Sequence, residues 1–168
     1  MRAPDPELHE LVTPYQLLEY EIEPDSGGAG QWRGGLGVRY SFKVDADNVA
    51  CANFGSGARD FTAPQGINDG KAAPPHHITI THADGSSDEL DGNRMYTFNT
   101  GDVISIHSSG GGGYGDPLRR DAKAVLRDVQ NGIVSEAAAR EQYGVVLRGS
   151  DGSAAMTIDE KATAALRN

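Results

Sequence analysis

The sequence predicts a mainly β protein with some α structure: an antiparallel β-sandwich or partly open barrel, followed by a short helical C-terminal segment. Apolar and polar residues alternate in short segments up to residue 115, and glycine makes up 22 of the 168 residues. After Pro117 the apolar spacing becomes helical. We therefore expect a glycine-rich antiparallel β domain over residues 1–115 and a helical segment over residues 116–168 packed on it.

Period-two alternation marks the strands. It is clearest at residues 37–44, where every second residue from Val38 to Val44 is apolar and the residues between are polar. Weaker alternation predicts further strands at residues 18–22, 49–54, 78–80, 95–98 and 104–106. Turn signals such as Asp84-Gly85 and Asp91-Gly92 separate them. Short strands at this spacing are typical of antiparallel sheets.

Capping residues define the predicted helices. Asp121 precedes a helical pattern that stops at Asn131-Gly132, and Ser135 precedes the alanine-rich segment 136–143, which Gly144 ends. Residues 145–147 are a short apolar run that we expect to be extended. Thr157 with Glu160 three residues later resembles a capping box, and predicts a third helix through Leu166.

Charge and composition exclude several classes of function. Residues 1–115 carry 16 acidic and 7 basic side chains and residues 116–168 carry 8 of each, so the net charge of -9 arises in the first part. This charge disfavours binding to nucleic acid or to an acidic membrane. No apolar run is long enough to span a membrane, and residues 1–15 lack the apolar stretch of a signal peptide, so we expect a cytoplasmic protein. The single cysteine, Cys51, is expected to be a packed small apolar residue.

Two glycine-rich segments, residues 24–37 and 108–117, each lie beside a predicted strand. Glycine allows another backbone or a ligand to approach within contact distance. A phosphate site is one interpretation, but neither segment has the P-loop spacing, and a dinucleotide fingerprint needs a parallel strand-to-helix unit. We therefore favour tightly packed structural loops. Trp32 and Arg33 lie between glycines, and a lone Trp there is most simply an interface anchor.

The histidines raise the question of a metal or nucleophile site. His76, His77 and His82 fall within seven residues, but on a strand His77 points to the face opposite the other two. We therefore predict no metal site there. His107 cannot readily reach the adjacent Ser108, although Ser109 is sterically possible as a partner. An autonomous hydrolase built on these histidines would need a pocket lined by them and a bound metal or a nucleophile–base hydrogen bond.

Several motifs, in order, resemble the C-terminal region of the hydantoinase B/5-oxoprolinase family. They are PDSGGAGQWRGGLG, APQGINDG, GDVISIHSSGGGGYGDPLRRD and IVSEAAAREQYGVVL. The resemblance covers about residues 15–148. One departure is Gln65, because many members have an aromatic residue after the proline of this Pro-x-Gly motif.

The resemblance implies a hydrolytic subunit of an ATP-dependent cyclic amide hydrolase, such as N-methylhydantoinase or 5-oxoprolinase, or a subunit of an acetone or acetophenone carboxylase. It implies that a hydantoinase A type subunit handles ATP and that a hydantoinase B type catalytic body carries the divalent metal. We therefore expect this chain to bind no cofactor itself and to complete the assembly. The alternative is a non-catalytic scaffold that keeps its docking surface.

The expected substrate or interface contacts lie in the two glycine-rich segments. They are Asp25, Ser26, Trp32, Arg33, Tyr114 and Asp116. Arg33 could pair with a carboxylate and Tyr114 could donate a hydrogen bond, and either could equally anchor an interface. No catalytic residue is assigned from the sequence.

Overall fold

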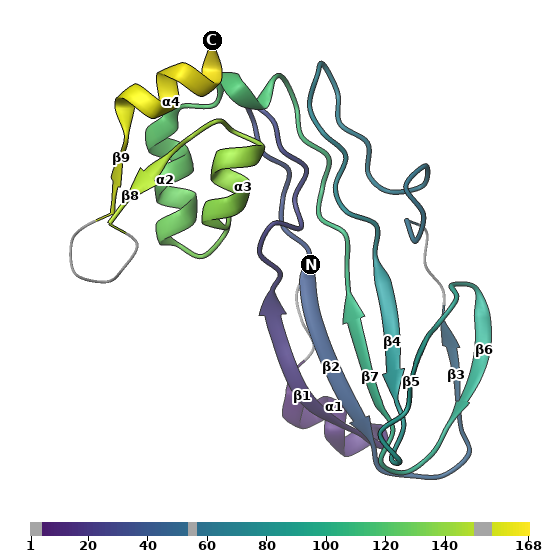
Figure 1. The fold of residues 1–168 in the computed structure, drawn as a ribbon. Coiled ribbons are helices and arrows are strands. Elements are labelled where there is room, and N and C mark those ends of the chain that lie inside the picture. Colours follow the sequence, from purple (N-terminus) through teal and green to yellow (C-terminus); the bar gives the residue numbers. More distant parts are fainter. Residues whose placement is uncertain (1–4, 54–56, 150–155) are drawn as a thin grey trace.

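A computed structural model describes residues 5–53, 57–149 and 156–168. Its main element is a five-stranded, open antiparallel sheet (Figure 1). The strand order is β1-β2-β7-β4-β5, and the strands are β1 (Tyr15–Ile22), β2 (Val38–Val44), β4 (His77–Thr81), β5 (Ser87–Glu89) and β7 (Val103–His107). The predicted class, mainly β with helices and with open antiparallel sheets, is confirmed.

The core of the sheet region lies between two layers. A two-stranded sheet of β3 (Val49–Asn53) and β6 (Arg94–Phe98) contributes Phe98 to an apolar cluster with residues of the larger sheet. Its buried members are Val44, Ile78, Ile80, Phe98 and Ile104. Alternation places the four members from the larger sheet on one face, because Ile104 is in register with Ile80 and with Phe42, which lies two residues before Val44. Cys51 packs against this cluster, as expected of a small apolar residue.

Beyond the end of the five-stranded sheet, three extended segments lie together. We call them the glycine-rich region, and they are residues 26–37, 64–73 and 108–115. They belong to the long connections that rise above the five-stranded sheet in Figure 1. Backbone hydrogen bonds join all three, for example from Gly28 N to Gly111 O (2.8 Å) and from Gly113 N to Lys71 O (2.9 Å). The region is thus held together through its backbone.

The C-terminal segment forms a small helical unit beside the glycine-rich region (Figure 1). Its elements are η1 (Pro117–Arg119), α2 (Ala122–Gln130), α3 (Glu136–Glu141), β8 (Leu147–Arg148), β9 (Thr157–Ile158) and α4 (Glu160–Arg167). Tyr143, Val125 and Val145 are fully buried in its core, and Ala29 of the glycine-rich region packs into the same cluster. The boundary proposed at residue 115 stays a prediction.

The structure corrects the predicted start of the last helix. Thr157 lies in β9, paired with Arg148, and the N-cap of α4 is Asp159, whose side chain accepts a hydrogen bond from Ala162 N. The cap therefore lies two residues later than the capping-box pattern indicates, and Asp159 also pairs with Arg148. Asp121 and Ser135 cap α2 and α3 as predicted.

Other boundaries differ by less. The helix expected over 136–143 ends at Glu141, and of the apolar run 145–147 only Leu147 belongs to a strand. The strand expected over 49–54 ends at Asn53, and residue 54 lies outside the described residues. Helix α1 (Pro6–Val12) and strand β5 were not predicted.

No helix among the described residues is long and apolar enough to cross a membrane.

Candidate functional site

Trp32, Ile67 and Tyr114 come together on one row of the glycine-rich region, and we call them the Trp32 cluster. Trp32 and Tyr114 form an antiparallel bridge, with reciprocal N–H to O bonds of 2.9 Å. Ile67 pairs with Tyr114 on the other side, in parallel. Paired residues project their side chains to the same side of a sheet. Three side chains from distant parts of the sequence therefore share one surface.

The cluster is unusually exposed for its size. The exposed fractions are 66% for Trp32, 61% for Ile67 and 49% for Tyr114. Isolated exposed apolar residues are common, but adjacent large ones that include Trp and Tyr are typical of binding surfaces. The sequence predicted Trp32 and Tyr114 as contact residues, and the structure brings these two together.

Close backbone packing fixes the position of the cluster. A Cβ atom at Gly34 would lie 1.8 Å from Gly111 O, and one at Gly113 would lie 2.0 Å from Ala29 O. Real Cβ atoms do not come this close to a carbonyl oxygen, so these segments can pack together only because both positions are glycine. Trp32 thus sits on a backbone scaffold with few ways to rearrange.

An ion cluster lies where the glycine-rich region meets the helical unit, and it holds the backbone on both sides of Trp32. Asp128 of α2 accepts from Arg120 (2.8 Å) and Arg33 (3.4 Å), and all three side chains are largely buried. Arg120 also donates to Gln31 O (3.1 Å) and Arg33 to Gly34 O (2.6 Å). Arg33 is therefore occupied within the chain, and Asp128 acts as a positioning residue for Trp32.

Tyr143 lies close to this ion cluster. Burial raises the pKa of the Tyr143 hydroxyl, and the nearby Arg120 and Arg33 charges oppose that shift. Because the hydroxyl stays protonated at neutral pH, Tyr143 serves here as a neutral, fully packed side chain of the helical core.

The remaining predicted contact residues use their polar atoms inside the chain. Asp25, which has a left-handed φ of 58°, accepts from Ser135 N (2.9 Å) and so ties the first glycine-rich segment to the start of α3. Ser26 is buried, donates to Glu23 O and accepts from Gly37 N (2.8 Å). Asp116 caps η1 by accepting from Leu118 N (2.9 Å). Their assignment as substrate or interface contacts stays a prediction.

The histidines fall into separate surroundings. His77 and His107 are paired across β4 and β7, and their rings stack with centroids 4.3 Å apart. His107 Nδ1 also lies 3.4 Å from Glu23 Oε2. His82 contacts Asp102 (3.1 Å) and Asp88 (3.4 Å) at the far end of β4. His77 and His82 thus have different partners, at opposite ends of β4.

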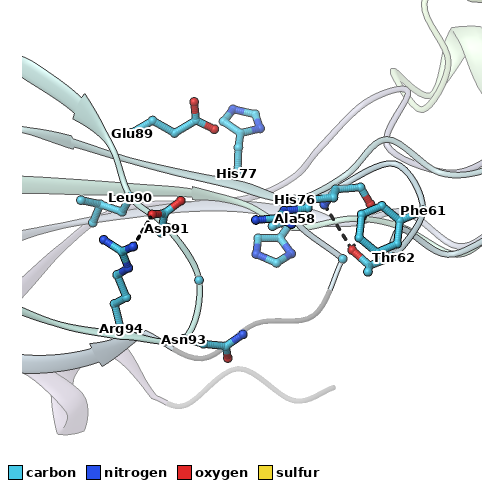
Figure 2. A pocket seen from close by; sticks show the side chains of 13 residues that line it. Ala58, Phe61, Thr62, His76, His77, Glu89, Leu90, Asp91, Asn93 and Arg94 are labelled. Atoms are coloured by element: carbon cyan, nitrogen blue, oxygen red, sulfur yellow. Dashed lines mark hydrogen bonds and ion pairs between the residues drawn. The ribbon is translucent and has the colours of Figure 1, made fainter.

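His76 and His77 do line one cavity, about 810 Å³ in volume (Figure 2). Both signs of charge surround it: Arg94 and Arg59 face the same space as Glu89 and Asp91, and Arg94 is paired with Asp91 (3.4 Å). Figure 2 shows His76 beside Phe61 and Thr62, apart from the Arg94–Asp91 pair. This mixed and open lining selects no ligand class.

The described residues do not fit the metal or the nucleotide that the family resemblance implies for the full complex. No three His, Cys, Asp or Glu side chains among residues 5–53, 57–149 and 156–168 are placed to hold a metal ion. The N–H groups of Gly28, Gly110, Gly111 and Gly113 donate to carbonyl oxygens of the chain, so they are not free to bind phosphate.

Sequence reasoning missed Ile67, Arg120 and Asp128. Ile67 is the one large apolar residue between Gly66 and Gly70. A large apolar residue in such a tight loop indicates a side chain on the surface. Asp128 is an acidic residue on the face of α2 that also buries Val125. A charge on a buried helix face predicts a charged partner, and this signal could have found the ion cluster.

Comparison with known proteins agrees with the predicted resemblance. Residues 1–117 match the family model described as Hydantoinase B/oxoprolinase. Caprolactamase subunit beta of Pseudomonas jessenii is 38% identical over 165 residues, which cover 97% of this chain and 28% of the relative. The chain thus spans about a quarter of the length of such relatives.

Two solved structures share the fold over 98% of this chain. The ATP-dependent caprolactamase of Pseudomonas jessenii aligns with a TM-score of 0.77 and 36% identity, and the match covers 28% of that chain. Acetone carboxylase, described as ATP-dependent, aligns with a TM-score of 0.80 and 27% identity, and the match covers 26% of that chain. The similar proteins are thus parts of ATP-dependent enzymes, one of them a named subunit.

Proposed function

This chain belongs to the hydantoinase B/oxoprolinase family, and from that premise we propose that it completes an ATP-dependent enzyme that hydrolyses the C–N bond of a cyclic amide. In this proposal it acts as the C-terminal part or a small subunit of the hydrolytic component. The observation that carries the proposal is the match to caprolactamase subunit beta over 97% of this chain.

The proposal divides the chemistry between components. A hydantoinase A type subunit binds ATP and activates the amide, and a hydantoinase B type catalytic body holds the divalent metal. This chain supplies residues that line the active site and contact the other components. The division is supported by the length comparison, because the match covers only 28% of caprolactamase subunit beta and leaves most of that subunit outside the part shared with this chain.

A ketone carboxylase is the second candidate, because the acetone carboxylase structure aligns with a TM-score of 0.80. Sequence identity favours the cyclic amide hydrolase: it is 36% with the caprolactamase structure and 27% with the carboxylase structure. A shared fold hosts both activities, so identity is the better guide to chemistry here.

The test exchanges domains in the intact relatives. The segment of caprolactamase subunit beta that matches this chain is replaced by residues 1–168, and the same exchange is made in acetone carboxylase. Each chimera is assembled with its companion subunits. Native mass reports assembly, and the activities are ATP-dependent hydrolysis of caprolactam and ATP-dependent carboxylation of acetone. Each enzyme with the segment deleted is the control.

We expect the caprolactamase chimera to exceed its deletion control by at least about tenfold, that is, by 1.4 kcal/mol in transition-state stabilisation. Activity of the acetone carboxylase chimera alone would favour the carboxylase instead. Two assembled but inactive chimeras would favour the scaffold alternative and contradict a catalytic contribution.

A further inference from the structure

The Trp32 cluster has the physical properties of a protein-docking anchor. Trp, Tyr and Ile offer large apolar areas, and Trp and Tyr have few rotatable bonds to freeze on binding. The backbone beneath them is already fixed by the hydrogen bonds between Trp32 and Tyr114, by those of Ile67 with Gly113 and Gly115, and by the Asp128 ion cluster. Little conformational entropy is therefore lost when this surface is covered.

A protein partner fits this surface better than a small molecule does. One cavity is lined by His76 and its neighbours and a second by Glu10 and its neighbours, and no residue of the cluster lines either of them. Small ligands bind in concave pockets, whereas exposed apolar side chains outside a pocket suit protein surfaces.

The length comparison and the charge point to one partner. The matches cover only 26–28% of the two solved relatives, so most of each relative's chain lies outside the part shared with this protein and is available to cover the cluster. A second copy of this chain is disfavoured, because the net charge of -9 arises within residues 1–115, the part that carries the cluster.

We infer that the Trp32 cluster is the anchor through which this chain docks on the catalytic body of a hydantoinase B type subunit. The inference rests on the proposed function and names the surface and the partner it uses. Arg33 and Asp128 then act indirectly, because they fix the backbone that presents Trp32.

Hydroxyl-radical footprinting tests the docking directly in the assembled caprolactamase chimera. Trp32 and Tyr114 are oxidisable, and Met95 of β6, which is 65% exposed, is an internal control of matched exposure. We expect the oxidation rates of Trp32 and Tyr114 to fall about tenfold from the isolated chain to the complex, as for a desolvated anchor, with Met95 unchanged. Unchanged rates at Trp32 and Tyr114 would overturn the inference, and so would protection at Met95 alone.

A variant that lacks two side chains of the cluster tests how much they stabilise the docked chain. The double substitution Trp32→Ala with Ile67→Ser removes exposed side chains but leaves their backbone bonds, so the isolated chain should melt as the parent does. In the chimera we expect cleavage at the exchange junction by trypsin to accelerate about tenfold or more. Met95→Ala is the control and should leave the cleavage rate unchanged.

The outcomes separate this inference from the proposed function. An active chimera whose double variant resists trypsin as well as the parent would overturn the docking inference and leave the function standing. A raised KM with unchanged cleavage would assign the cluster to substrate contact instead. Dimerisation of the isolated chain that the double variant abolishes would assign it to self-association.

Discussion

The sheet region and the glycine-rich region of this protein are held together by opposite means. Between the two sheets, the side chains of Phe98, Ile104 and their neighbours fill the space, and the backbones stay apart. In the glycine-rich region the backbones themselves are in contact, and a Cβ at Gly34 would lie 1.8 Å from a carbonyl oxygen. A side-chain core can adjust to a change of volume, whereas backbone packing has no rotamers with which to adjust.

The largest expected effect is therefore a single methyl group in the glycine-rich region. Gly34→Ala should lower the free energy of unfolding by more than about 4 kcal/mol, because two backbones must separate to admit the Cβ. Gly35→Ala is the matched control, since nothing lies within 4 Å of its Cβ position. Urea denaturation compares them, and equal midpoints for the two variants would contradict backbone contact.

The ion cluster tests how firmly the helical unit holds the glycine-rich region. Asp128→Asn keeps the side-chain shape but leaves Arg33 and Arg120 without their carboxylate, and we expect a loss of about 3 kcal/mol. Asp121→Asn is the control, because asparagine caps a helix as well as aspartate does. If urea denaturation showed a smaller loss of unfolding free energy for Asp128→Asn than for Asp121→Asn, the ion pairing would not be needed for stability.

A volume change in the sheet core should cost less. Ile104→Val removes one methylene from a fully enclosed side chain, and the expected loss is about 1 kcal/mol by urea denaturation. If this conservative change cost as much as Gly34→Ala, the contrast between the two regions would disappear.

The smallest effect concerns pH at one end of the sheet. The hydrogen bond to Asp102 raises the pKa of His82 above its usual 6.5, and Asp88 adds to the shift. The charged imidazole thus stabilises the fold fully below pH 6.5, and this contribution is lost as pH rises through the raised pKa. Melting temperatures of the parent and His82→Gln should converge between pH 6 and pH 8.5, and parallel curves would rule out this linkage.

The sequence predicted elements whose side chains alternate, and missed those without such a signal. Strands β2, β4 and β7 follow period-two patterns, and Asp121 and Ser135 are standard caps. Helix α1 has seven residues and buries none of them, so no apolar face marks it. Asp159 and not Thr157 caps α4, because Thr157 is paired with Arg148 in the β8–β9 sheet, a contact that no local pattern contains.

The same limit applies to the candidate site. Trp32 and Tyr114 could be selected because aromatic residues among glycines are unusual, but their pairing with Ile67 could not. Glycine has no side chain, so glycine-rich segments carry no periodicity that specifies register or partner. Arg33 was selected for its charge, yet only the structure shows that Asp128 engages it.

The backbone packing around Gly34 and Gly113 also has a calorimetric consequence. Unfolding this region hydrates peptide groups more than apolar side chains, and exposure of polar surface lowers the heat capacity whereas apolar exposure raises it. The heat capacity increment of the whole chain should therefore fall below the usual value of about 12–15 cal/mol/K per residue. Its stability curve is then flatter than that of a side-chain core of equal size, so the free energy of unfolding changes less between cold and warm conditions.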